Sequence, residues 1–95
     1  MNYFAIIHKD PNSDFGVSFP DFPGCITAGR TVEEAKEMAL ESLIGHIQLV
    51  REAEGAVPDP SSLDQVISNP KFNDGTPFVV TIATHHVDRA AAGQD

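Results

Sequence analysis

The chain has few basic residues, and their scarcity narrows what it can bind. Six Lys and Arg residues stand against 14 Asp and Glu residues among 95, so the formal net charge is −8. The basic residues are scattered singly, whereas a protein that neutralises nucleic acid needs them clustered. Direct nucleic-acid binding is therefore not expected. A basic protein partner fits the charge, although acidic surfaces also serve simply to keep proteins soluble.

Cysteine and long apolar runs are also scarce. Cys25 is the only cysteine, which excludes an internal disulfide and suits a reducing compartment. With no activating base beside it, Cys25 is better explained as a small buried residue than as a nucleophile. No stretch approaches the roughly 20 apolar residues of a membrane span, and the N-terminus lacks the features of a signal peptide. We expect one soluble, cytoplasmic domain.

The segment Phe19-Pro20-Asp21-Phe22-Pro23-Gly24-Cys25 combines two of the seven prolines with one of the seven glycines. Two prolines fix φ and the glycine can adopt positive φ, so the backbone has few conformations. We expect a rigid surface loop that displays Phe19 and Phe22. The loop has no group that could activate its carboxylate or thiol for catalysis. A rigid, apolar loop without activated catalytic groups indicates a recognition surface.

The flanking sequence predicts an antiparallel meander. Residues 3–8 and 15–19 have strand character, with turn formers at 10–14 between them, and a third short strand is plausible at 25–28. Near the C-terminal end, the turn residues 73–75 precede 78–83. This last run is apolar enough to predict a strand buried on both faces.

A long helix is predicted to start at Thr31. The sequence Thr31-Val32-Glu33-Glu34 is typical of a capping box, in which Glu34 also accepts from the N–H of Thr31. Gly55 is placed to end the helix in a left-handed conformation. Serines after Pro58 are expected to cap a short helical turn that carries Leu63, Val66 and Ile67 over the core. At 100° per residue the apolar residues of the long helix share one side: Val32, Ala35, Ala39, Leu40, Leu43, Ile47 and Val50.

These elements, over roughly residues 3–83, resemble the HicB antitoxin family, the acidic halves of bacterial toxin–antitoxin pairs. The most specific match is the segment from Val17 to Cys25 followed by Thr31 to Ala35, which is similar to the family pattern S-F-P-D-[FL]-P-G-C … T-x-E-E-A. The resemblance implies an α+β, partial ribonuclease-H-like fold of order β-β-β-α-β, with antiparallel strands and one long helix packed on one sheet face. It also implies a small basic HicA-type toxin as partner, an mRNA-cleaving protein with a double-stranded-RNA-binding fold.

The resemblance also frames the domain organisation. Residues 1–84 are expected to form the HicB-like antitoxin domain, and residues 85–95 a C-terminal tail. Many family members continue into a helix-turn-helix or ribbon-helix-helix segment that binds DNA. The tail is too short and too weakly basic for either, so no DNA-binding domain is recognised here.

A ribonuclease-H-like outline invites a search for a catalytic metal site, and none is convincing. The candidate carboxylates belong to Asp10, Asp14, Asp21, Glu34 and Glu41, but the first two occupy turn positions where aspartate is common. Adjacent histidines such as His85 and His86 point to opposite faces of a strand and cannot easily share an ion with Asp88. We expect no catalytic residue, metal or cofactor.

The leading hypothesis is an antitoxin that neutralises its toxin by covering the toxin's active, RNA-binding surface. An orphan small-ligand or protein-binding module, and a vestigial nuclease, are the alternatives. An exposed sheet edge in so small a domain favours a homo-oligomer, either a dimer or a tetramer. The expected partner-binding residues combine the loop with acidic helix positions: Phe19, Pro20, Asp21, Phe22, Pro23, Glu33, Glu34, Glu37 and Glu41.

Overall fold

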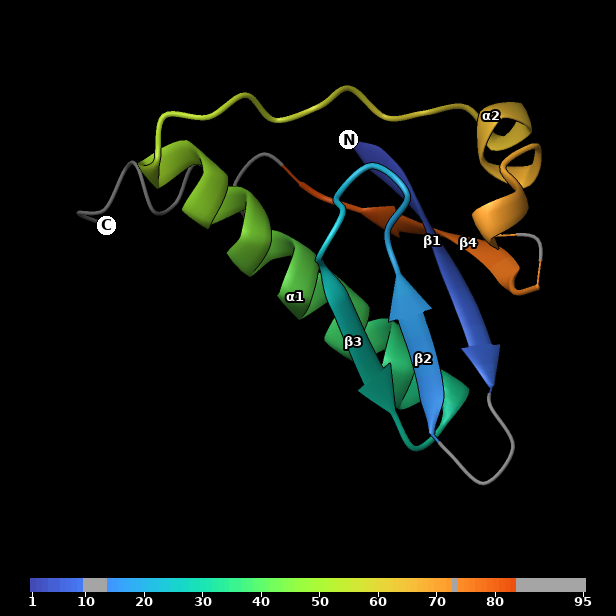
Figure 1. Cartoon of the computed structure of the whole chain (residues 1–95). Helices are drawn as coiled ribbons and strands as arrows, with labels where there is room; N and C mark the ends of the chain where they lie inside the picture. The colour runs from blue at the N-terminus through green and yellow to red at the C-terminus, as the bar shows by residue number, and fades with distance from the viewer. Residues whose placement is uncertain (10–13, 73, 84–95) are drawn as a thin grey trace.

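The computed structural model describes residues 1–9, 14–72 and 74–83, and within them the architecture is α+β (Figure 1). The predicted tail at 85–95 and most of the turn at 10–14 lie outside the described residues. The elements are β1 (Asn2–Lys9), β2 (Phe15–Ser18), β3 (Ile26–Gly29), α1 (Val32–Glu52), α2 (Leu63–Ile67), the 3₁₀ turn η1 (Pro70–Phe72) and β4 (Thr76–Thr81). The predicted order β-β-β-α-β is confirmed, with α2 and η1 inserted before the last strand. The ribonuclease-H-like label stays a prediction.

The strands form one antiparallel sheet in the order β3-β2-β1-β4. The first three make the predicted meander, and β4 returns to pair with β1, where Phe4 stands opposite Val79. The expectation that the last strand is buried on both faces is wrong. It lies at the sheet edge, where Val80 is buried but Val79 is 50% exposed. Because the residues of this strand are apolar on both faces, the sequence did not show that the side chains of only one face are buried.

Both ends of α1 differ in detail from the prediction. Thr31 caps the helix by accepting from the N–H of Glu34 at 3.0 Å, but Glu34 accepts at 2.8 Å from the N–H of Arg30 and not from that of Thr31. At the other end the left-handed residue is Glu54, with φ +58°, and not Gly55. The N–H of Glu54 donates to Arg51 and that of Gly55 to Val50, which is a Schellman ending.

The core lies between α1 and one face of the sheet. From the helix it takes Ala35, Ala39, Leu43 and Ile47, all fully buried as predicted, whereas Val32 remains 40% exposed. The helix can approach β3 closely because Gly29 has no side chain: a Cβ there would lie 2.4 Å from the backbone nitrogen of Ala35. The sheet supplies the facing apolar residues Tyr3, Ala5, Val17, Val80 and Ile82.

The short helix α2 begins as predicted, with Ser62 and Gln65 forming a capping box. The predicted burial of its three apolar side chains is correct at one position only. Val66 is 2% exposed, but Leu63 and Ile67 are 43% and 52% exposed and do not cover the core. A helix of five residues makes little more than one turn, so only about one of its side chains can point directly at the core, and its three apolar residues could not all be buried.

Candidate partner-binding surface

The proline loop between β2 and β3 is turned inward. Phe19 and Phe22 are 2% and 3% exposed, so the expectation that they form an apolar contact surface is wrong. The loop is made of two successive turns, in which Phe22 donates to the Phe19 carbonyl and Cys25 to the Phe22 carbonyl, and Gly24 has φ +89°. The ring of Phe22 packs edge-on against Tyr3 at 4.9 Å and against His46 at 5.6 Å between centroids. The loop therefore closes one end of the core.

Asp21 also has a structural role that the sequence analysis did not anticipate. Its carboxylate accepts from the backbone N–H of Ser61 at 2.9 Å and from the Ser61 hydroxyl. Nearby, the Tyr3 hydroxyl donates to the Pro58 carbonyl at 2.6 Å. Burial raises the pKa of the Tyr3 hydroxyl, and the charges of Asp21 and Asp59 raise it further. These contacts hold the connection between α1 and α2 against the proline loop, through Asp21, and against β1, through Tyr3.

The acidic positions of α1 do face solvent. Glu33, Glu37 and Glu41 are exposed and recur every four residues, so they form one line along the helix, here called the acidic stripe. Glu34 is exposed as well, although its carboxylate is engaged by the Arg30 amide.

The loop and the start of the acidic stripe lie at opposite ends of the domain (Figure 1). Phe22 contacts His46, and Glu33 precedes His46 by 13 residues, which is roughly 20 Å along a helix axis. The expected partner-binding residues therefore do not form one continuous surface. Of the expected partner-binding residues in the loop, only the exposed Pro23 and the partly exposed Pro20 and Asp21 are accessible, and Asp21 already accepts hydrogen bonds from Ser61.

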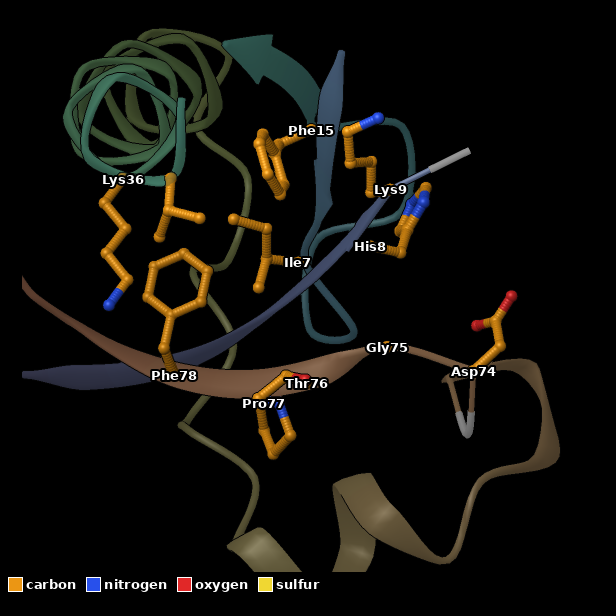
Figure 2. Close-up of a pocket in the computed structure, with 11 residues that line it drawn as sticks. Ile7, His8, Lys9, Phe15, Lys36, Asp74, Gly75, Thr76, Pro77 and Phe78 are labelled. Carbon is orange, nitrogen blue, oxygen red and sulfur yellow. The ribbon is translucent and has the colours of Figure 1, made fainter. Parts of the chain in front are cut away.

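A hollow beside β4 was not signalled by any sequence pattern. It has a volume of about 460 Å³, and apolar side chains from β1, β2, α1 and β4 point into it, among them Ile7, Phe15 and Phe78 (Figure 2). Lys36 lies at its rim with Nζ 5.3 Å from the centroid of the Phe78 ring. A second hollow of about 420 Å³, lined by Lys36, Leu40 and β4, continues along the strand. The helix thus leaves an apolar trough along the β4 side of the sheet.

Chemical groups suited to catalysis are not assembled in the described part of the chain. Cys25 is buried, and burial raises the pKa of its thiol, which favours the unreactive protonated form. Across residues 1–9, 14–72 and 74–83 no three His, Cys, Asp or Glu side chains are grouped to hold a metal ion. Asp10, His85, His86 and Asp88 lie outside the described residues. Among the described helices, none has the length and apolar character to cross a membrane.

Comparisons with curated proteins support the family resemblance. An uncharacterised 14.9 kDa protein of Haemophilus phage HP1 is 35% identical over 91 residues, which cover 92% of this chain and 66% of that protein. Antitoxin HicB 1 of Photorhabdus laumondii is 37% identical over 65 residues, which cover 68% of this chain and 42% of the antitoxin. The chain thus spans between about two fifths and two thirds of the length of these two relatives.

Solved structures agree with the sequence comparisons. The Burkholderia pseudomallei antitoxin HicB superimposes with a TM-score of 0.84 and 26% identity, over 94% of this chain and 68% of that one. A chain of a HicA3 and HicB3 toxin–antitoxin complex gives a TM-score of 0.74 and 28% identity, over 87% of this chain and 99% of that one. The model of the HicB-like antitoxins of bacterial toxin–antitoxin systems matches residues 3–93. The chain belongs to the HicB-like antitoxin family.

Proposed function

We propose that this protein binds a small, basic HicA-type toxin and neutralises it by covering the toxin's RNA-binding, active surface, without catalysing a reaction itself. The observation that carries the proposal is the acidic stripe, a row of exposed carboxylates on the most regular element of the domain. The likeness to a chain of the HicA3 and HicB3 complex supports the choice of partner.

The proposed contact surface is centred on α1 and excludes the two loop aromatics. Carboxylates at Glu33, Glu37 and Glu41 are spaced by about one helical turn each, so they present a line of negative charge to a cationic surface. Such complementarity accelerates the encounter more than it deepens the affinity. We propose that Pro20, Asp21 and Pro23 contact the partner only at the far end of this surface, while Phe19 and Phe22 hold the loop in place.

The test compares two triple variants of equal charge. In the first, Glu33, Glu37 and Glu41 are changed to Gln. The matched control carries Asp14→Asn, Glu52→Gln and Asp64→Asn, which remove the same charge from exposed positions outside the stripe. Stopped-flow association with the toxin at low and high salt is the measurement. We expect the stripe variant to associate about tenfold more slowly at low salt with a flatter salt dependence, and the control to change little.

Two results would contradict the proposal in different ways. Equal slowing of both variants would mean that net charge alone steers the toxin and that the stripe is not the contact. Failure of the unmodified protein to form a complex even at low salt would refute the pairing with a basic toxin. The orphan binding module would then be favoured, because the hollow beside β4 offers it an apolar site.

Self-association belongs to the proposed function as well. The sheet has an open edge at β4, and small domains with such an edge are prone to pair through it. We infer a homodimer, or a tetramer built from dimers, whose formation does not require the toxin.

A further inference from the structure

The hollow beside β4 lies at the end of the sheet where α1 begins. Alternation along the paired strands puts Phe15, Ile7 and Phe78 on the sheet face that carries the helix, on three neighbouring strands. The start of α1 covers them incompletely, because the helix lies close against β3, where Gly29 lets its backbone approach (Figure 2). The three side chains are therefore only partly buried, and they line a volume of about 460 Å³.

The hollow has the size and the walls of a small-ligand site. Phe15 and Phe78 stand on either side of it with Ile7 between them (Figure 2). Val32, from the first turn of α1, adds a fourth apolar wall and is 40% exposed. Ligand sites are mostly apolar clefts of about 300 to 1,000 Å³. A planar aromatic body between the two phenylalanine rings would bury their exposed surface and add ring contacts.

The charge of the hollow differs in sign from that of the whole protein. Among the described residues, its lining holds two of the six basic side chains, Lys9 and Lys36, against one carboxylate, that of Asp74. With His8 neutral, two lysines and one aspartate give a net charge of +1, whereas the chain carries −8. The Nζ of Lys36 lies 5.3 Å from the centroid of the Phe78 ring, so this cation is held at the rim of the apolar site.

The two ends of the hollow suit an anion unequally. Asp74 lies at the end that holds His8 and Lys9, away from Lys36 (Figure 2). The acidic stripe is centred about 100° around α1 from Lys36 and lowers the positive potential there. The Lys36 ammonium is nevertheless turned toward Phe78, on the side of the hollow. An anion in the hollow is therefore attracted to the Lys36 end, whereas Asp74 repels it from the other end.

We propose that the hollow beside β4 binds a small planar aromatic carboxylate, with its ring system between Phe15 and Phe78 and its carboxylate beside the Nζ of Lys36. The volume equals that of about 15 water molecules at roughly 30 Å³ each, which suits a small molecule and not a polypeptide segment. This binding function goes beyond the proposed neutralisation of a toxin and does not depend on it.

Titration of the toxin-free protein, followed by NMR of its backbone amides, tests the site with three matched ligands. The anion 2-naphthoate, the neutral 2-naphthamide and the cation 2-naphthylmethylammonium share one ring system. We expect a Kd of roughly 0.1 to 1 mM for 2-naphthoate, because a small ligand in a half-open site gains modest affinity. The amide should bind about two- to fivefold more weakly, as for one exposed ion pair, and the cation more weakly again.

Two pairs of variants separate the charge from the apolar space. Lys36→Gln should weaken 2-naphthoate about two- to fivefold and leave 2-naphthamide unchanged, whereas Lys71→Gln removes an exposed charge outside the hollow and should change neither. Val32→Phe places a ring in the hollow and should weaken both ligands about tenfold, because the ligand loses its contacts there. Met38→Phe, at an exposed helix position outside the hollow, is the control.

Three results would overturn the proposal. The absence of any shift at about 5 mM 2-naphthoate would mean that the hollow is not a ligand site. Shifts centred on α2 or β3, instead of around residues 7, 15, 32–36 and 78, would place the ligand elsewhere. Equal affinity for the three ligands would refute the selection of an anion. Each of these results leaves toxin binding to be judged separately by the association kinetics, since the titration contains no toxin.

Discussion

Replacement of Phe22 by alanine distinguishes a loop that builds the core from a loop that contacts a partner. The side chain is 3% exposed and packs edge-on against both Tyr3 and His46. Truncating a buried phenylalanine to alanine costs about 3 to 5 kcal/mol, through lost burial and the cavity left behind. The two ring contacts, at about 0.5 to 1.5 kcal/mol each, place Phe22 toward the upper end of that range.

A loss of about 4 kcal/mol is large for this domain, because small domains have free energies of unfolding of about 5 to 15 kcal/mol. The assay is urea denaturation followed by circular dichroism at 222 nm, which reports on α1. Pro23→Ala is the matched control, since Pro23 is exposed in the same loop, and we expect it to cost less than about 1 kcal/mol. Phe22→Leu should cost less than Phe22→Ala, because it leaves a smaller cavity.

The result that would refute this reasoning is specific. If Phe22→Ala unfolded within about 1 kcal/mol of the unmodified protein and yet bound the toxin more weakly, Phe22 would be a contact residue and the inward loop would be wrong. If the variant is strongly destabilised but neutralises the toxin normally once folded, the loop aromatics serve the core alone.

Three further substitutions test other parts of the fold. Gly29→Ala should destabilise the protein by more than about 3 kcal/mol in the same urea assay, because the Cβ of the new alanine would overlap the backbone of Ala35. Ala28→Gly, at the exposed neighbouring position, is the control and should cost about 1 kcal/mol or less. Glu54→Gly should stabilise the protein by about 1 kcal/mol, because glycine adopts the left-handed φ of +58° without strain. The measurement is the melting temperature, which should rise. An unchanged or lower melting temperature would contradict the Schellman ending. Tyr3→Phe should cost about 1 kcal/mol at pH 7 by removing the hydrogen bond to Pro58. The pKa of the Tyr3 hydroxyl is raised above 10 in the folded protein, so the protonated hydroxyl contributes its full stabilisation below about pH 10. This stabilisation is lost as the pH rises through the folded-state pKa. In that alkaline range the unmodified protein should therefore lose more stability than Tyr3→Phe.

Local patterns predicted the elements well because the signals act over a few residues. The Thr31 cap, the serine cap after Pro58 and the alternation of Phe15 and Val17 each depend on neighbours in the chain, and the structure has all three elements. The family resemblance rested on the same kind of signal, a rigid segment followed at a fixed distance by a helix start, and it is confirmed.

The direction of side chains was predicted less well, because it depends on what lies across the fold. Proline and glycine in the loop indicated rigidity, but the ring of Phe22 has its inward partners far away in the sequence, at Tyr3, 19 residues before it, and at His46, 24 residues after it. Likewise an apolar run cannot tell a central strand from an edge strand. The trough beside β4 is created by where α1 crosses the sheet, which no local pattern encodes.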